Sequence, residues 1–378
     1  MVVRRHLVPR LPPLNIPSAD ERTHRQLQKH NHAVKTLHFS PPSHPPFVSV
    51  SQSFPTYPDS QQQLQEIKDW LSTRHYDALG IGTFGPVDPR EGSPTYGYIT
   101  STPKPGWNMV DVVGFLSDGS VPCKFDTDVN APALAEYMWG AKKDGETSCA
   151  YITVGTGVGV GLVVNGQAVH GLMHPEAGHL CLKRMPGDDF AGVDATFGGA
   201  SVEGLASTVA LAARKASRNC AREDLPKVVD ADPVWEATAH SLAGLCASLV
   251  LVVSPERIVL SGGVMNRTLL YGKVRKWTRE LLNGYIDHPA VTTDAIDEYI
   301  TPSSFGQNAG MVGSLTLAHI AYDEAGGRGA GAGAATATTT GRCCKVTIPF
   351  TSCAVSVAVA AAAVVGLGAL VVAKASKK

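Results

Sequence analysis

Apolar and polar positions alternate with two different periods along the central part of the chain, which predicts a globular body of strands and helices at residues 47–323. "FVSVSQSF" (47–54) alternates as a strand does. "DSQQQLQEIKDWLSTR" (59–74) has the apolar spacing of an amphipathic helix, with Asp59 or Ser60 as its cap. The further elements that the pattern predicts are strands at 78–86, 121–127, 148–155, 160–169 and 257–263, and helices at about 129–142, 200–217, 233–253, 266–284 and 307–322.

The order of these elements predicts the fold class. Strand and helix signals alternate, and the dipeptide Asn165-Gly166 marks one hairpin within this order. Mixed alternation of this kind is typical of an α/β fold, here with an N-terminal lobe at 47–145 and a C-terminal lobe at 146–323. A chain of 378 residues, 44% of them hydrophobic, is long enough for two such domains.

Residues 1–46 differ from this body in composition. They contain seven Arg or Lys against two acidic residues, together with six histidines and several prolines. No apolar period persists in them, which predicts a disordered basic arm. A transit peptide is the alternative, although serine is sparse and the prolines oppose an amphipathic helix. The irregular spacing of the histidines is typical of a solvated loop rather than of a metal site.

The C-terminal part of the chain differs again. Residues 324–350 are rich in Gly, Ala and Thr, which predicts a flexible linker. A run of 21 uncharged residues (353–373) follows, and a lysine cluster ends the chain. That length crosses a bilayer as a helix, so we expect a tail-anchor helix within 351–378, with the body in the cytosol. A soluble Ala-rich tail is the alternative.

Charge and cysteine content limit the partners and the compartment. The formal net charge is zero, so nothing in the balance favours nucleic acid as a partner. The eight cysteines form no Cys-x-x-Cys pair, which favours reduced thiols and a cytoplasmic location over a disulfide framework.

Two glycine-rich turns are candidate nucleotide sites. "YITVGTGVGVG" (151–161) places glycines between two apolar strands, where backbone N–H groups and the Thr156 hydroxyl could bind phosphate oxygens. It lacks the Lys-Ser/Thr of a Walker A loop and precedes a strand rather than a helix, so a structural hairpin is equally compatible with it. "SGGVMN" (261–266) follows a buried strand, where a glycine pair lets a nucleotide approach the backbone or simply forms a tight turn. The candidate residues in the two turns are Gly155, Thr156, Gly157, Gly159, Gly262 and Gly263.

Acidic and histidine side chains in three other segments are candidates for binding a polyol. Asp128 follows a strand, where a carboxylate could take the proton of an attacking hydroxyl while Asn130 orients a neighbouring one. Capping of the following helix is the alternative role for both residues. In "HPEAGHL", Glu176 and His179 are three apart and could hold vicinal hydroxyls, the histidine being a possible metal ligand as well. Glu203 in "SVEGLAS" is a further hydroxyl acceptor.

The motifs taken in order resemble the ROK family of sugar kinases, and within it the bacterial-type fructokinases. The resemblance covers about residues 48–323. It rests on "GIGTFGPVD", "YGYITSTPKPGW", "DTDVNAPALAEYMWG", "YITVGTGVGVG", "HPEAGHL", "VEGLAS", "RIVLSGGVM" and "GQNAGMVGSLTLA". It implies a two-lobed actin-like ATPase (ribonuclease H-like) fold, in which the last helix (307–322) packs back on the N-terminal lobe. It also implies phosphorylation of a hexose hydroxyl by ATP and Mg²⁺, in a protein that forms a homodimer.

The resemblance also implies roles for individual residues. Asp128 is similar to the catalytic base. Thr156 and its flanking glycines would bind the ATP phosphates, and Gly262 and Gly263 would lie near the adenosine. The residues that would hold the sugar or line its pocket are Gly85, Pro86, Asn130, Glu176, His179 and Glu203.

Three departures from the family pattern matter. No "GGTK"-type phosphate hairpin occurs in residues 1–46, and the strand that carries it is expected to be central in the first sheet; "HAVKTLHF" (32–39) could replace the strand but has no glycine. Thr208-Val209 stands where fructokinases have Gly-Pro. Of the family's zinc ligands only the histidine is retained, as His179, and one histidine cannot make a four-ligand site, so we expect no structural zinc and no other metal site. The positions where Cys, His and Cys would fall are Asp194, Phe197 and Ser201.

The motifs leave several functions open. The first is a fructokinase that phosphorylates fructose at O6. A glucose or mannose kinase is the enzymatic alternative, and a membrane-tethered pseudokinase that binds sugar or a partner is the alternative of another class. A ROK repressor is disfavoured because residues 1–46 show no helix-turn-helix pattern. A different explanation of the departures is an incorrect gene model whose true first exon encodes the phosphate hairpin.

Overall fold

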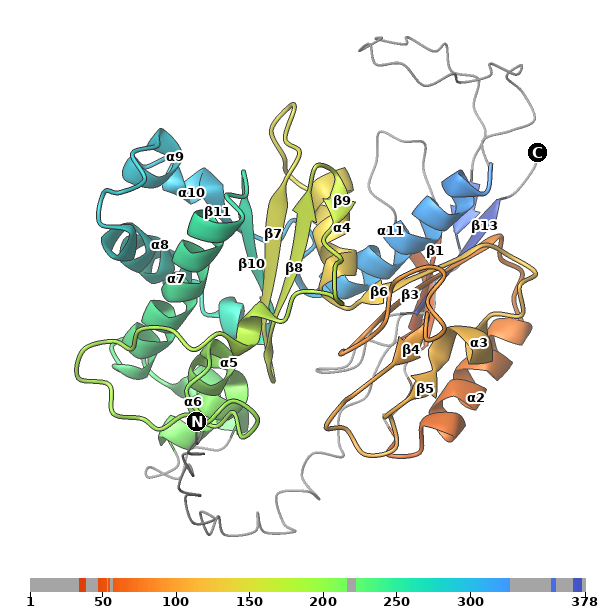
Figure 1. The fold of residues 1–378 in the computed structure, drawn as a ribbon, viewed down its shortest axis with the longest axis horizontal. Helices are drawn as coiled ribbons and strands as arrows, with labels where there is room; N and C mark the ends of the chain where they lie inside the picture. The colour runs from red at the N-terminus through yellow and green to blue at the C-terminus, as the bar shows by residue number, and fades with distance from the viewer. Residues whose placement is uncertain are drawn as a thin grey trace, which may run out of the picture. The chain divides into compact units, whose positions relative to one another are not determined.

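The computed structural model describes residues 54, 57–215 and 222–326, together with the backbone of four strands at 34–38, 47–52, 355–357 and 370–375. All of these lie in one compact unit, Asn31–Lys378. Two main sheets and the helices that cover them make up the unit (Figure 1).

The first sheet has six strands in the order β2-β1-β12-β13-β3-β6. Only β3 and β6 are parallel neighbours; every other pair of adjacent strands is antiparallel. The strands are β1 (Val34–His38), β2 (Phe47–Gln52), β3 (Ala78–Thr83), β6 (Cys123–Thr127), β12 (Val355–Val357) and β13 (Leu370–Ala375).

A small core lies between this sheet and the amphipathic helix α2 (Ser60–Ser72). Asp59 caps α2 by accepting hydrogen bonds from the N–H groups of Gln61 and Gln62, so Asp59 and not Ser60 is the cap. The core residues include Leu64, Ile67, Leu71, Leu79, Ile81 and Phe125. The remaining elements here are β4 (Tyr98–Ile99), β5 (Val110–Asp111) and α3 (Val112–Leu116).

Two predictions about the ends of the chain are wrong where the structure describes them. Val34–His38, in the predicted disordered arm, is a strand that pairs with β2 and β12. Val355–Val357 and Leu370–Ala375, in the predicted tail-anchor helix, are also strands. The physical reason is that a Val-rich run suits a strand as well as a membrane helix, and β13 finds pairing partners in β12 and β3. The other residues of the predicted arm, linker and tail lie outside the described residues.

β13 also bears on the strand of the family pattern that carries the phosphate hairpin and is expected to be central in the first sheet. It lies inside the sheet, between β12 and β3, where it runs antiparallel to both. An interior position of the first sheet is therefore filled from the C-terminal part of the sequence.

The second sheet has five strands in the order β11-β10-β7-β8-β9. β7 and β8 form an antiparallel hairpin, while β10 runs parallel to β7 and β11. The predicted Asn165-Gly166 turn is confirmed: both residues have positive φ, at 52° and 74°, and they join β8 to β9. The strands are β7 (Cys149–Val154), β8 (Val158–Val164), β9 (Gln167–Ala168), β10 (Ile258–Ser261) and β11 (Ile300–Pro302).

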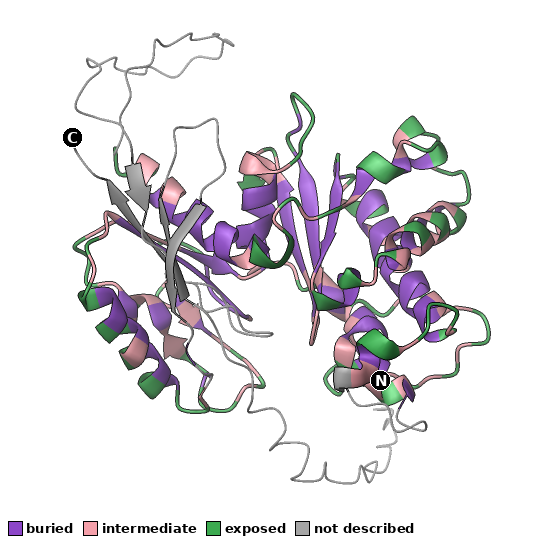
Figure 2. Cartoon of the chain, turned by 180° about the vertical axis from the view of Figure 1, so that it is seen from behind, coloured by how far each residue is buried: buried purple, intermediate pink, exposed green. Residues whose placement is uncertain are grey.

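Alternate residues of the second sheet enter two different cores. Ile152 and Val154 of β7 belong to the larger core, which contains residues of α5, α6, α7 and α8, whereas Tyr151 belongs to a smaller core with residues of α4 and α11. Helices therefore cover both faces, and the strands between them are largely buried (Figure 2). The helices are α4 (Asn130–Trp139), α5 (Val202–Ala206), α6 (Thr208–Lys215), α7 (Val234–Val252), α8 (Leu269–Leu282), α9 (Pro289–Thr292), α10 (Ile296–Tyr299) and α11 (Ala309–Glu324). The 3₁₀ turns are η1 (Ala177–His179), η3 (Arg222–Lys227), η4 (Gly263–Asn266) and η5 (Gly306–Asn308).

α7 is the one helix in the described part of the chain whose length and composition would suit a membrane span. Its apolar window is 72% buried inside the protein, which is typical of a core helix.

α11 connects the two sheets. It packs on β3 of the first sheet and on α4, and α4 in turn contacts β7 and β8 of the second sheet. Glycines permit this close approach: a Cβ on Gly80 would lie 2.1 Å from the Ser314 carbonyl oxygen, and one on Gly313 would lie 2.4 Å from the Pro132 nitrogen. The packing fixes β6 and the start of α4 next to β8, and the candidate site lies there.

Candidate functional site

Asp128 lies at the carboxyl ends of β3 and β6, directly before α4. Its backbone N–H donates to the Thr83 carbonyl oxygen at 2.8 Å, which holds it at this edge of the parallel pair. The alternative capping role does not apply, because α4 begins after Val129 without a side-chain cap and the Thr127 hydroxyl accepts from the Asn130 N–H. The carboxylate of Asp128 is thus left for other chemistry.

Asn130 is fully buried and already bonded on both sides of its amide. Its Nδ2 donates to Asp126 at 2.9 Å, and its Oδ1 accepts from the Leu162 N–H at 3.3 Å. Asp126 in turn contacts Nε2 of His170 at 2.8 Å. These contacts tie β6, α4 and β8 together, so they correct the expectation that Asn130 faces a sugar hydroxyl: its amide is engaged by the protein.

Gly85 and Pro86, joined by a cis peptide bond, lie against the "HPEAGH" segment. A Cβ on Gly85 would meet the His174 ring at 2.8 Å and a Glu176 carboxylate oxygen at 3.1 Å. His174 is 2% exposed, and its Nε2 accepts from the Val87 N–H at 2.9 Å. The structure therefore brings Gly85 and Glu176 together, as the sequence predicted, with His174 as the unpredicted link.

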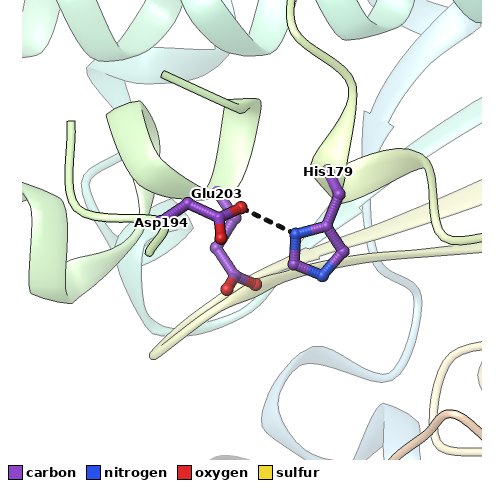
Figure 3. Close-up of side chains that lie close together, drawn as sticks. All are labelled: His179, Asp194 and Glu203. Atoms are coloured by element: carbon purple, nitrogen blue, oxygen red, sulfur yellow. Dashed lines mark hydrogen bonds and ion pairs between the residues drawn. The ribbon is translucent and has the colours of Figure 1, made fainter. Parts of the chain in front are cut away.

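Glu203 and His179 lie close together beside Asp194 (Figure 3). His179 Nδ1 contacts the Asp194 carboxylate at 2.8 Å, and a Glu203 oxygen accepts from the Val158 N–H at 2.9 Å. Ligand atoms of the three residues lie within 4.8 Å of one another. Both predicted sugar-binding side chains are thus held in place by hydrogen bonds, and Nε2 of His179 has no hydrogen-bond partner in the described part of the chain.

Charges in this region perturb one another. Partial burial raises the pKa of Glu176, whose side chain is 44% exposed, to about 7; His179 opposes this shift, and the negative charges of Asp128 and Glu203 add to it. Burial likewise raises the pKa of Asp128, against the opposing effect of the Lys104 ammonium. The predicted base and the predicted sugar-binding groups therefore share one electrostatic environment.

Sequence reasoning missed three residues of this region. Lys104 lies within the motif "YGYITSTPKPGW", which predicts no role for it, and its ammonium acts on Asp128. His170 and His174 were not singled out, although they contact Asp126 and Val87. The sequence signal for Lys104 was its position between two prolines in a motif shared with the ROK sugar kinases. The sequence around His170 contains no pattern that would have indicated a role for it.

The first glycine-rich turn is fixed by its own backbone and by Thr208. The Gly155 N–H donates to the Gly157 carbonyl oxygen at 2.8 Å, and both the N–H and the hydroxyl of Thr208 donate to the Gly155 carbonyl oxygen at 2.7 Å. A Cβ on Gly157 would lie 2.3 Å from a Glu203 oxygen, so the turn adjoins the cluster of Figure 3. Thr208, in place of the family's glycine, secures this turn.

The other glycines of the predicted nucleotide site differ among themselves. A Cβ on Gly159 would meet the Val129 side chain at 2.6 Å, so packing of β8 on the start of α4 accounts for it. Gly262 has φ of 93°, and its Cβ would meet the Val154 carbonyl oxygen at 2.4 Å. Gly263 begins η4, and a Cβ there would have no neighbour within 4 Å. Gly263 therefore faces open space, which is compatible with contact to a ligand.

The residues at the family's zinc positions do not fit zinc. His179 offers nitrogen and Asp194 oxygen, but Phe197 offers no ligand atom, and its ring stacks on His179 at 4.5 Å between centroids. The Asp194 carboxylate is occupied: it accepts from the Ser201 hydroxyl and from the N–H groups of Thr196 and Phe197, besides contacting His179. A tetrahedral site of four nitrogen or sulfur ligands cannot form from this set.

Comparison with known proteins defines the class. The fold is that of the ROK sugar kinases, which have the actin-like ATPase architecture. A ROK glucokinase from Streptomyces griseus superposes with a TM-score of 0.58 at 20% identity, covering 77% of this chain and 100% of that one. A ROK hexokinase from Thermus thermophilus gives a TM-score of 0.56 at 24% identity, over 77% and 99% of the two chains.

Sequence comparison is more specific. The ROK family profile matches residues 53–321, and the chain belongs to the ROK family. The fructokinase of Pediococcus pentosaceus is 39% identical over 265 residues, which are 70% of this chain and 88% of that protein. The fructokinase of Zymomonas mobilis is 41% identical over 245 residues, 64% and 78% of the two chains. The resemblance seen in the motifs is thereby confirmed.

Proposed function

We propose that this protein transfers the terminal phosphoryl group of ATP to a hexose, with fructose as substrate and O6 as acceptor. Relatives named fructokinase support the sugar. The observation that carries the proposal is that the charges of Asp128, His179 and Glu203, which come from segments up to 75 positions apart, all act on the carboxyl group of Glu176. Such convergence of titratable groups is expected of an active site.

Each group has a role that follows from its chemistry. Asp128 takes the proton of the attacking hydroxyl; its raised pKa makes it a stronger base than an ordinary aspartate. Glu176, His179 and Glu203 bind the other hydroxyls, and Gly85-Pro86 lines the pocket beside Glu176. Positioning of this kind is the main protein contribution to phosphoryl transfer.

The nucleotide belongs at the two glycine turns. The backbone N–H groups of Thr156 and Gly157 and the Thr156 hydroxyl are the proposed phosphate ligands, since the Gly155 N–H is bonded within the turn. Gly263, beside open space, is the proposed neighbour of the adenosine. Mg²⁺ bound to the phosphates neutralises the charge that develops during transfer.

We propose further that the bonds of Asp194 replace the structural zinc of the family. The carboxylate joins His179, Ser201 and the 196–197 backbone, as a metal would join its ligands. Elemental analysis of the purified protein is expected to give far less than one zinc per chain, with no loss of thermal stability in a chelator. Stoichiometric zinc whose removal lowers the melting temperature would contradict this.

The function is tested on the full chain with ATP-Mg²⁺ and fructose, glucose or mannose, by following ADP release. Asp128→Asn is expected to lower kcat by about 10³-fold, within the range for loss of a general base. Asp144→Asn, at an exposed aspartate, is the matched control and should leave kcat unchanged. Phosphorylation of none of the three sugars above the Asp128→Asn background would refute the proposal; a preference for glucose or mannose would change the substrate. Light scattering of the same preparation tests the expected homodimer. Fractionation of cells that express the protein tests the expected cytoplasmic location.

A further inference from the structure

Lys104 is a buried cation without a hydrogen-bond acceptor. It lies in the loop between β4 and β5, and its Nζ is buried with no partner in the described part of the chain. The ammonium lies 3.5 Å from the centroid of the Phe84 ring, and Phe84 directly precedes Gly85 and Pro86. The cation is therefore placed at the wall of the proposed sugar pocket.

The loop that carries Lys104 is firmly anchored. The Trp107 ring packs edge-on against Phe84 with centroids 5.5 Å apart, and its Nε1 donates to the Tyr57 carbonyl oxygen at 3.2 Å. Trp107 itself is 3% exposed. These contacts hold the loop next to Phe84, so the Lys104 Nζ is buried although most neighbouring residues of the loop are exposed.

A buried ammonium in this state needs a further partner. The aromatic face offsets part of the lost hydration, but it accepts none of the three N–H donors. Asp128 is the one charged group that acts appreciably on Lys104, and no ion pair within 4.0 Å joins these two described residues. The three donors therefore have no acceptor in the described part of the chain, and the charge that acts on the ammonium is that of Asp128.

We propose that Lys104 is a substrate-binding residue of this pocket, whose ammonium donates to oxygen atoms of the sugar next to the hydroxyl that Asp128 deprotonates. The inference rests on the proposed function and deepens it, since it adds an ammonium to the carboxylates and the histidine proposed for this pocket. A sugar hydroxyl between Lys104 and Asp128 would accept a hydrogen bond from the ammonium and donate one to the carboxylate.

The charge of Lys104 also acts on the base. Burial lowers the pKa of Lys104 to about 8, against the opposing effect of Asp128, so the ammonium is still charged at neutral pH. Its charge lowers the pKa of Asp128, which burial raises. Removal of the cation should therefore shift the pKa of Asp128 further upward and leave less of the ionised base at a given pH.

The test replaces the charge and keeps the shape. Lys104→Met retains an unbranched apolar stem on Phe84 and removes the ammonium. Lys142→Met is the matched control, since Lys142 is exposed and its Nζ lies 4.4 Å from the centroid of the Tyr137 ring. Fructose binding is measured by calorimetry without ATP, and KM for both substrates and the pH profile of kcat are measured by ADP release.

We expect Lys104→Met to weaken fructose binding at least tenfold, to leave KM for ATP unchanged and to move the acid limb of kcat to higher pH. Its melting temperature should equal or exceed that of the wild type, because a buried unpaired charge is removed. Unchanged fructose binding, or an effect on ATP alone, would overturn the inference while leaving the kinase proposal intact. Failure of the wild type to bind any sugar would overturn both.

Discussion

The two halves of the proposed site are built from different materials. The sugar half consists of charged or ionisable side chains, Asp128, Glu176, His179 and Glu203, several of which are fixed by bonds to neighbouring groups. The nucleotide half consists of backbone turns at Gly155–Gly157 and Gly262-Gly263, in which side chains are mostly absent. The first half should therefore respond to pH and charge, and the second to any atom added at Cβ.

The largest expected effect falls on the nucleotide half. Gly262→Ala places a Cβ at positive φ and 2.4 Å from the Val154 carbonyl oxygen, so we expect the free energy of unfolding to fall by about 3 kcal/mol and KM for ATP to rise. Urea denaturation and steady-state kinetics measure the two quantities.

Gly263→Ala is the matched variant. Its Cβ meets nothing within 4 Å, so stability should change by less than about 0.5 kcal/mol while KM for ATP rises several-fold. Equal stability of the two variants would show that the close approach at Gly262 is not required.

The sugar half should respond to pH through Glu176. The ionised carboxylate accepts stronger hydrogen bonds from sugar hydroxyls than the protonated acid does, and its pKa is raised to about 7. Fructose binding should therefore be complete above this value and weaken as pH falls through it, approaching about tenfold per pH unit. Calorimetric titration from pH 8 to pH 5 measures the loss.

Glu176→Gln separates this group from the others that titrate. The variant should bind fructose more weakly at pH 8 but with little change between pH 7 and pH 5. A wild type whose affinity is flat over the same range would contradict the assignment of Glu176.

The smallest effect is expected at Thr208, in the nucleotide half. Thr208→Val removes the hydroxyl that donates to Gly155 but keeps the backbone N–H bond, so about 1 kcal/mol of stability should be lost, with a two- to fivefold rise in KM for ATP of the order that one hydrogen bond supplies. Fructose binding should not change. Thr292→Val, which removes an exposed hydroxyl bonded to His288, is the control, and an equal effect there would refute a specific role for Thr208.

Local period predicted the second sheet well and the first sheet poorly. Ile152, Val154 and Tyr151 alternate between two cores within one strand, and the Asn165-Gly166 turn is read from two residues. The first sheet depends instead on β13, whose partners are distant in sequence, so its run of Val and Ala could not be told from a membrane helix by composition.

The site shows the same limit. Motif order identified Asp128 and Glu176, because each lies within a segment that carries its own pattern. It could not tell that the Asn130 amide is occupied by Asp126 and Leu162, or that the Lys104 ammonium lies beside Phe84, since both facts depend on which way a side chain turns in the folded protein.

The pairing of β13 with β3 also sets an order of assembly during synthesis. Ile81 pairs with Leu370, and Ala78 with Ala373. Because β13 is synthesised after every other described strand of both sheets, one edge of β3 stays unpaired until then. Until then the nascent chain carries an open strand edge of the kind that aggregates or recruits chaperones. The first sheet is thus begun first and completed last.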